Sequence, residues 1–119
     1  MIVRAERSED VAAIGELHLA GFPTDAEARL VELLRDAGNL TVSLVAEADG
    51  RVVGHVAFSP VSALVGAPGV GLAPVAVRPS HRRRGIASEL IVRGRDAADQ
   101  RRVGAVLTGV RVTGVGAPA

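Results

Sequence analysis

The residues with the clearest capacity for chemistry lie in one basic turn, residues 82–88. This segment reads Arg82-Arg83-Arg84-Gly85-Ile86-Ala87-Ser88 and follows an apolar stretch. A helix that begins here directs its first N–H groups outward without partners, and Gly85 and Ala87 have no bulky side chain to keep a ligand away. Such a helix start binds phosphate, and arginines add charge-assisted hydrogen bonds. The sequence therefore predicts a pyrophosphate site on the main-chain amides of Arg83 to Ser88.

A strand must lead into this turn and a helix must leave it. Residues 70–77 are apolar and mostly small, as in a buried strand, and Pro79 ends the run. Beyond the turn, apolar positions recur with a helical period to about Gln100, and residues 105–110 are expected to form a last short strand. The basic turn is therefore the first connection of a strand-helix-strand unit.

A β-hairpin is expected before this unit. Asp49-Gly50 is a strong signal for a two-residue turn, because both residue types tolerate positive φ. Hydrophobicity changes to a period of two in the flanking segments 41–47 and 52–58. These segments predict two antiparallel strands, followed by a Gly- and Pro-containing loop over residues 60–69.

Two helices are expected between a short first strand, residues 2–4, and the hairpin. Ser8-Glu9-Asp10 places a hydroxyl cap and acidic side chains at the start of the first helix. Thr24-Asp25-Ala26-Glu27 has the spacing of a capping box, in which the Thr and Glu side chains each satisfy an exposed amide of the second helix. Gly38 is well placed to end that helix.

The predicted order of elements is β-α-α-β-β-β-α-β. An antiparallel meander followed by a strand-helix-strand crossover indicates an α+β fold with a mixed, mostly antiparallel sheet. The 119 residues suffice for one domain with one site. With two Phe and neither Trp nor Tyr, the core must consist of Val, Leu, Ile and Ala, and tyrosine chemistry is excluded.

Composition argues against several other classes of protein. The absence of Cys excludes disulfides, thiolate nucleophiles and cysteine metal ligands. A net charge of +1, without aromatic residues beside the arginines, argues against a nucleic-acid partner. Residues 56–77 carry no charge, but three Pro and three Gly interrupt them, so we expect no membrane span. The first residues lack the pattern of a signal peptide, which makes a cytoplasmic location the default expectation.

The basic turn also matches the signature of a protein family. Arg82-x-x-Gly85-x-Ala87 fits the (Gln/Arg)-x-x-Gly-x-(Gly/Ala) signature of the Gcn5-related N-acetyltransferases (GNAT), and residues 75–79 resemble the strand before it in that family. Segments 24–31 and 53–60 further resemble a bacterial branch of predicted N-acetyltransferases. The predicted elements occur in the family's order from residue 1 to about 110, so the chain resembles a GNAT domain.

This resemblance implies an acetyl-CoA-dependent N-acetyltransferase, in which a small-molecule or peptide amine attacks the thioester directly. Main-chain groups of residues 75–77 would pair with the pantetheine arm, and an amide near Ala76 or Val77 would polarise the thioester carbonyl. The resemblance implies these residues as contacts of acetyl-CoA: Val75, Ala76, Val77, Arg82, Arg83, Arg84, Gly85, Ile86, Ala87 and Ser88. The general acid and base stay unassigned; Glu27, in a family-like setting near the acceptor entrance, is the favoured acidic candidate.

The sequence departs from the family after about residue 110. The family fold continues with another helix and two strands, which often supply a tyrosine near the sulfur, whereas residues 111–119 form a Gly-rich tail. We therefore expect an incomplete GNAT domain over residues 1–110. Truncation and a complete short protein that borrows the missing surface from a partner both stay open. Either way, an uncovered sheet edge favours a homodimer or aggregation.

Two further functions compete with acetyl transfer. One is a non-catalytic remnant that binds coenzyme A or only dimerises, and the other, weaker one is a nucleic-acid module that uses the arginine turn. His18, on a helix, and His55, in a strand, each stand alone and favour structural roles, whereas His81 is close enough to the turn to approach phosphate or acceptor. Neither a pair of carboxylates nor metal-spaced histidines stands out, so no metal is predicted.

Overall fold

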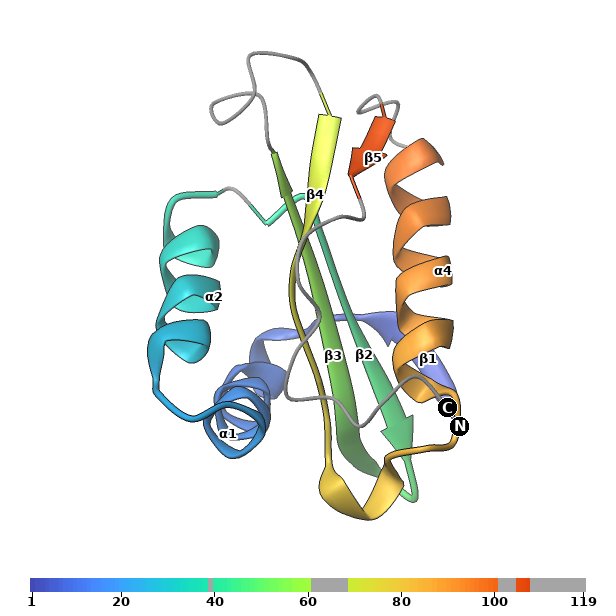
Figure 1. Cartoon of the computed structure of the whole chain (residues 1–119). Helices are drawn as coiled ribbons and strands as arrows, with labels where there is room; N and C mark the ends of the chain where they lie inside the picture. The colour runs from blue at the N-terminus through green and yellow to red at the C-terminus, as the bar shows by residue number, and fades with distance from the viewer. Residues whose placement is uncertain (39, 61–68, 101–104, 108–119) are drawn as a thin grey trace.

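One five-stranded sheet with helices on both faces makes up the fold (Figure 1). The computed structural model describes residues 1–38, 40–60, 69–100 and 105–107. In chain order the elements are β1 (Ile2–Ala5), η1 (Ser8–Asp10), α1 (Val11–Gly21), α2 (Ala26–Asp36), β2 (Val42–Ala48), β3 (Arg51–Pro60), β4 (Gly69–Val77), η2 (Pro79–His81), α4 (Ile86–Gln100) and β5 (Ala105–Leu107). This order confirms the predicted succession. Most of the expected loop, residues 61–68, and the expected tail lie outside the described residues.

The strands lie in the sheet in the order in which they occur in the chain. β1, β2, β3 and β4 pair antiparallel, whereas β5 pairs parallel to β4 between residues 105–107 and residues 69–71. A parallel neighbour requires a crossover, and α4 provides it. The mixed, mostly antiparallel α+β sheet that the sequence predicts is therefore confirmed.

The hairpin between β2 and β3 turns at the predicted dipeptide. Asp49 has φ of 53° and Gly50 has φ of 74°, the positive values that a type I′ turn requires at both central positions. Pairing continues from Ala48–Arg51 beside the turn to Val42–Phe58 at the far end. This hairpin places β3 at the centre of the sheet, next to β4.

A separate hydrophobic cluster lies on each face of the sheet. α1 and α2 cover one face, where Ile14, Leu17 and Val31 pack against Val45 and Ala76. α4 covers the other face, and the side chains clustered there are Val53, Val56, Phe58, Val75, Val77, Ile86 and Leu90. In the described ranges, no helix combines the length and the apolar run that a membrane crossing demands.

The start of α2 differs from the prediction. The helix begins at Ala26 with Asp25 as its N-cap, and the Thr24 hydroxyl accepts a hydrogen bond of 3.3 Å from the Ala26 amide. Glu27 is therefore the second helical residue and not the third, so its carboxylate cannot complete the reciprocal bond of a capping box. The predicted capping box is wrong for this reason.

The contact between Gly94 and Phe58 leads to a stability prediction. A Cβ at Gly94 would overlap the Phe58 ring, whereas a Cβ at Gly15 in α1 would meet no atom within 4 Å. Gly→Ala in an open helical position stabilises by about 1 kcal/mol, and overpacking costs about 1–3 kcal/mol. We expect Gly94→Ala to lower the free energy of unfolding by about 1–2 kcal/mol and Gly15→Ala to raise it, measured by urea denaturation. Equal effects of the two changes would contradict this packing.

Candidate active site

A β-bulge interrupts β4 just before the residues predicted to bind the cofactor. Val56 of β3 pairs with Val75, and Phe58 pairs with Leu72, so Ala73 and Pro74 together oppose the single residue Ala57. Pro has no N–H to donate and is placed in sheets at edges or bulges. The bulge re-aims the end of β4 relative to its neighbours, and residues 75–77 follow it directly.

Beyond the bulge, β4 presents main-chain groups at an open edge. The Arg78 amide donates to the Val53 carbonyl at 2.7 Å. Hydrogen-bonded and non-hydrogen-bonded pairs alternate along an antiparallel ladder. Because Arg78 is hydrogen-bonded to Val53, Val77–Gly54 is a non-hydrogen-bonded pair and Ala76–His55 is again a hydrogen-bonded pair. Ala76 therefore directs its N–H and C=O towards β3. The corresponding groups of Val75 and Val77 point the other way. Among the described strands, β5 pairs with β4 only at residues 69–71, which leaves this edge open at residues 75–77.

The basic turn brings a run of free amides beside that edge. Arg83 and Gly85 have φ of 64° and 76°, and α4 begins at the next residue, Ile86. Within the described residues, no protein oxygen accepts a hydrogen bond from the amides of residues 83–88. Alternation of right- and left-handed backbone at a helix start makes an anion-binding concavity. The predicted amides are therefore free, as phosphate binding needs.

Gly54 holds the start of α4 close to the sheet. A Cβ there would lie 3.1 Å from Leu90 Cδ1 and 3.2 Å from Ile86 Cγ2. Because Gly54 is the strand partner of Val77, the same contact places the free amides of α4 next to the end of β4. A methyl group there would require Ile86 and Leu90 to shift by a few tenths of an ångström, and a larger side chain would require more.

The three arginines of the turn differ in what they contact. Arg82 donates from Nε to the Val77 carbonyl at 3.0 Å and so ties the turn to the end of β4. Arg83 and Arg84 are exposed, and neither side chain has a hydrogen bond or ion pair within the described part of the protein. Arg82 thus positions the turn, while the other two side chains are free to reach an anion.

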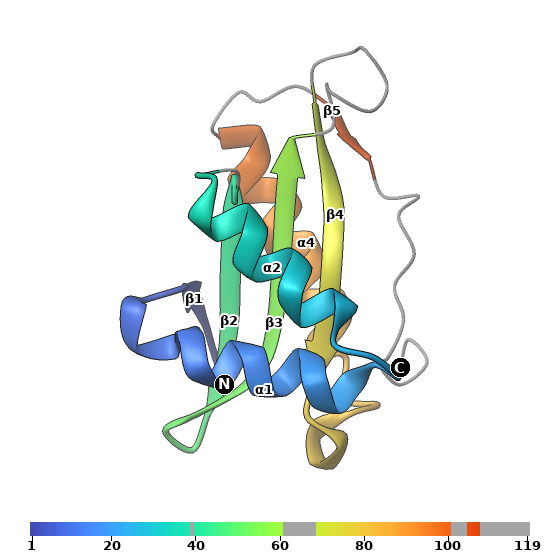
Figure 2. The ribbon, with the colours of Figure 1, turned by 90° about the vertical axis from the view of Figure 1, so that its left-hand side faces the viewer.

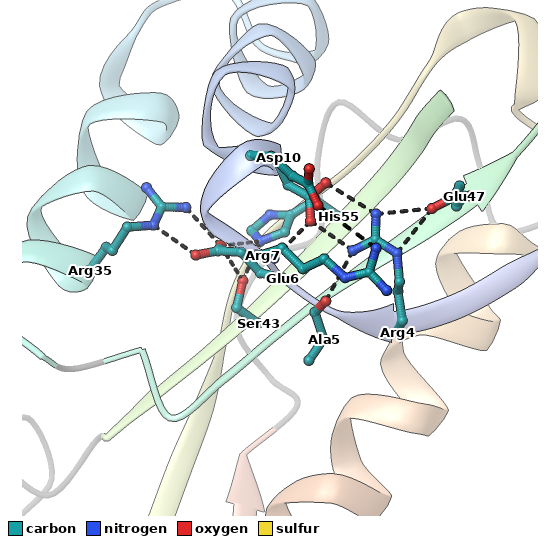
Figure 3. A network of polar contacts seen from close by, with 10 residues as sticks. Arg4, Ala5, Glu6, Arg7, Asp10, Arg35, Ser43, Glu47 and His55 are labelled. Carbon is teal, nitrogen blue, oxygen red and sulfur yellow. Dashed lines mark hydrogen bonds and ion pairs between the residues drawn. The ribbon is translucent and has the colours of Figure 1, made fainter. Parts of the chain in front are cut away.

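A network of polar side chains lies on the α1/α2 face of the sheet (Figure 3). Glu6, just after β1, accepts bonds of 2.9 and 2.8 Å from Arg35 and one of 2.6 Å from the Ser43 hydroxyl. Ser43 Oγ lies 2.8 Å from His55 Nε2, and His55 Nδ1 lies 2.9 Å from His18 Nε2. We call Arg35, Glu6, Ser43, His55 and His18 the buried polar network. His55 is the strand partner of Ala76, so the network reaches β4.

Burial fixes the protonation states in this network. It lowers the pKa of His18 to about 4, helped by the positive charge of Arg35, and it lowers the pKa of His55 well below its usual value. Burial also raises the pKa of the Glu6 carboxyl, but the hydrogen bonds from Arg35 and Ser43 outweigh it and hold that pKa below its usual value. Both histidines are therefore neutral and Glu6 is ionised at neutral pH.

A second group of ion pairs fixes β1 to the start of α1. Arg4 donates two bonds to the Asp10 carboxylate, at 2.7 and 3.1 Å, and one of 3.0 Å to Glu47 on β2. The Arg7 amide donates to the same carboxylate at 2.7 Å. These bonds lower the pKa of Asp10 below its usual value and set the direction in which α1 leaves the sheet.

Other candidate residues lie apart from the open edge or lack partners. Glu27 has one carboxylate oxygen, Oε1, that is buried and without a hydrogen bond among the described residues. Among the described residues, the His81 side chain has one hydrogen-bond partner, its neighbour Ser80, at 2.8 Å. In the same ranges, no three His, Cys, Asp or Glu side chains are grouped so that they could hold a metal ion.

Comparison with known families agrees with this geometry. The profile of the acetyltransferase (GNAT) family matches residues 11–117. The chain belongs to this family.

Named relatives show how close the match is. N-acetyltransferase YhbS of Escherichia coli K12 is 42% identical over 110 residues, which cover 91% of this chain and 66% of YhbS. The crystal structure of E. coli YhbS in complex with CoA superimposes with a TM-score of 0.81 at 40% identity, over 88% of this chain and 59% of that one. A GNAT acetyltransferase from Brucella melitensis in complex with acetyl-CoA gives 0.78 at 33% identity, over 92% and 76%. This GNAT chain therefore spans about two thirds of the length of its E. coli relative.

The family assignment confirms the resemblance, while the roles of individual residues stay predictions. Sequence reasoning missed the bulge in β4, although Pro74 inside a strand was its signal. It also missed the buried polar network of this GNAT chain, because His18 and His55 are 37 residues apart and each carries no local sign of a partner.

The neutral histidines lead to a prediction for acid stability. In the unfolded chain His18 takes up a proton below its ordinary pKa of 6.5, whereas in the folded chain it does so only near 4. The unfolded state then binds more protons, so the free energy of unfolding falls as pH drops from 6.5 towards 4, by up to about 1.4 kcal/mol per pH unit from this group. We expect His18→Gln to flatten the slope of urea stability between pH 7.5 and 5.

The carboxyl groups do not interfere in this window. Glu6 and Asp10 have lowered pKa values, so their stabilisation is complete above the unfolded values near 4 and is lost only at lower pH. Gly15→Ala, on the same helix but without a titrating group, is the control and keeps the wild-type slope. Equal slopes for His18→Gln and the wild type would show that His18 is not buried in its neutral form.

Proposed function

We propose that this chain binds acetyl-CoA at the end of β4 and the start of α4, and transfers the acetyl group to an amine. The single observation that carries the proposal is the run of free amides at residues 83–88 beside the open edge of β4. Two relatives support it, because the E. coli structure holds CoA and the Brucella structure holds acetyl-CoA. The acceptor is an amine whose identity is open.

The residues present fit the phosphates of the cofactor. A Cβ at Gly85 would meet nothing within 4 Å, so the space above the turn is open. A pyrophosphate there accepts main-chain amides and gains from the positive end of the α4 dipole. Arg83 and Arg84 are exposed and free to add charge-assisted bonds. Recognition of this kind depends on backbone shape and on small residues in the turn, here Gly85 and Ala87.

The open edge of β4 fits the amide-containing arm of the cofactor. Val75 and Val77 direct main-chain groups outward, so an extended amide chain can pair with them as an added strand. The Val77 carbonyl is already held by Arg82, which leaves the Val77 N–H as a donor at the end of the strand. We assign to this N–H the stabilisation of negative charge on the thioester oxygen during attack.

Acetyl-CoA supplies the activated acyl group as a thioester. The protein holds that thioester against β4, and its remaining task is to accept the proton that an ammonium group must lose before it can attack. Direct transfer requires no nucleophilic side chain, in keeping with a chain that has no Cys.

Replacement of Gly85 tests the binding site. A valine side chain would cover the free amides, and loss of about two charge-assisted hydrogen bonds, at about 1.5–3 kcal/mol each, corresponds to at least about a hundredfold weaker binding. We expect calorimetric titration with coenzyme A to show this loss for Gly85→Val. Gly38→Val is the matched control, because Gly38 has φ of 74° against 76° for Gly85 and equally open surroundings at the end of α2.

Both substitutions place valine at a left-handed backbone position, which costs about 1–2 kcal/mol in each variant. A loss of affinity that occurs only in Gly85→Val is therefore due to the site and not to backbone strain. Equal affinity of the two variants for coenzyme A would refute the placement of the phosphates. Release of free thiol from acetyl-CoA in the presence of a panel of amines tests the transfer itself. Binding without thiol release would favour the non-catalytic alternative.

A further inference from the structure

We propose that the buried polar network is a proton relay for the acceptor amine, with His18 Nδ1 as the entry and Glu6 as the exit. This inference rests on the proposed function and names the residues that would remove the ammonium proton. It starts from a continuous series of short contacts, in which Glu6, Ser43, His55 and His18 are joined by distances of 2.6, 2.8 and 2.9 Å.

The ionised Glu6 carboxylate sets the direction of every hydrogen bond in the series. A carboxylate only accepts, so the Ser43 hydroxyl must donate its one hydrogen to Glu6. Ser43 then has only lone pairs to offer His55, whose Nε2 must carry the hydrogen. Because His55 is neutral, its Nδ1 is bare and accepts from His18 Nε2–H. These tautomers are assigned from the hydrogen-bond network.

The series ends in a lone pair without a partner. His18 is also neutral, so with hydrogen on Nε2 its Nδ1 is bare. This atom is buried, the side chain is 0% exposed, and within the described residues it has no hydrogen-bond partner. A buried polar atom without a partner is uncommon and costs about 1–3 kcal/mol. The structure thus holds a buried acceptor in place, which a purely structural contact between α1 and β3 would not need.

His18 lies in the last two turns of α1, the helix that packs against β4 at Ala76. α1 crosses the face of the sheet from β1 to β4, so that its last turns lie over β4 (Figure 2). His55, the next member of the series, is the strand partner of Ala76. His18 also lines a cavity of about 420 Å³ between α1 and α2, which Glu16, Asp25 and Glu32 line as well. Arg29 and Arg35 line it too, and because Arg35 is paired with Glu6, the remaining lining is acidic overall and suits a positively charged amine.

The proton transfer balances without an oxidant or a further reactant. The ammonium group gives a proton to His18 Nδ1, His18 Nε2–H passes to His55 Nδ1, His55 Nε2–H passes to Ser43, and the Ser43 hydrogen passes to Glu6. The amine becomes neutral and Glu6 becomes a carboxylic acid, while each bridging group ends with the number of hydrogens it began with. Glu6, whose side chain is 15% exposed, returns the proton to solvent.

Concerted movement suits the charges that face the two rings. Arg35 from α2 disfavours positive charge on either histidine, and Asp10 from η1 only partly offsets it at His55. A ring that gains and loses a proton together never becomes an imidazolium. The starting state returns when the Ser43 hydroxyl rotates back and each ring loses its Nδ1 hydrogen to solvent and gains one from solvent on Nε2.

Nuclear magnetic resonance of the histidine rings tests the direction of the relay without any turnover. In the full-length protein labelled with ¹⁵N-histidine at pH 7, we expect both His18 and His55 to carry hydrogen on Nε2, and Ser43→Ala to abolish that preference at His55. Hydrogen on His18 Nδ1 would overturn the proposal, because the entry would then be a donor.

Kinetics test the use of the relay. His18→Gln retains an N–H for His55 but has no basic nitrogen, so we expect kcat for an acceptor amine to fall about a hundredfold with the KM for acetyl-CoA unchanged. Ser43→Ala lowers kcat at least about tenfold, and Ser43→Thr, which keeps the hydroxyl, restores it.

Failure of the relay and failure of the proposed function give different results. If the wild-type protein does not bind coenzyme A, the proposed function fails, and the ring tautomers are still measured. Wild-type kcat in His18→Gln overturns the relay and leaves the proposed function intact. Binding of coenzyme A without transfer to any amine in the panel overturns both the acetyl transfer and the role of the relay in it.

Discussion

Close packing of α4 on β3 at Gly54 determines where the candidate site lies. The helix approaches the strand so closely that Ile86 and Leu90 occupy the space that a side chain at Gly54 would need. Gly54 is paired with Val77, so the first turn of the helix, with its free amides, lies beside the open end of β4. A larger residue at this position would disturb the packing that brings the two parts of the candidate site together.

The two faces of the sheet differ in the kinds of side chain that they bury. The α4 face is an apolar cluster of branched aliphatic side chains around Phe58, which makes the helix a rigid support for its own N-terminus. The α1/α2 face contains apolar side chains as well, but it also buries His18 and His55, which the half-buried Ser43 hydroxyl connects to Glu6. Buried polar groups need hydrogen-bond partners in the protein or in water, and here the bonds lead from Glu6 to His18 Nδ1, which has no partner among the described residues.

The proposed binding of the cofactor through the main chain requires few particular residue types at the site. Peptide groups of Val75 and Val77 and amides after Arg82 are available whatever their side chains are, provided that the bulge and the positive φ values are kept. Side-chain identity is required mainly where space is tight or φ is positive, at Gly54 and Gly85. In the proposed acetyl transfer, the strictest chemical demand falls on removal of the ammonium proton, the step that we assign to the buried polar network.

The sequence by itself determined the elements and the location of the candidate phosphate-binding turn, because these depend on local rules. Asp49-Gly50 specifies a hairpin through backbone φ, hydrophobic periods specify strands and helices, and the small residues after Arg82 specify a helix start open to a ligand. Local rules failed at both helix starts. Ser8 is not the predicted hydroxyl cap of α1, which begins at Val11 after Asp10, and a shift of one residue at Thr24 removes a capping box from α2.

Only the tertiary structure decided which distant side chains meet. Strand pairing brings Ser43 and His55 together across β2 and β3, and the path of α1 over the sheet adds His18. Nothing in the neighbouring sequence distinguishes these residues, so each histidine taken alone is interpreted as a structural residue. Their joint chemistry arises from burial and hydrogen-bond direction, which exist only after the sheet has formed and the helices have packed on it.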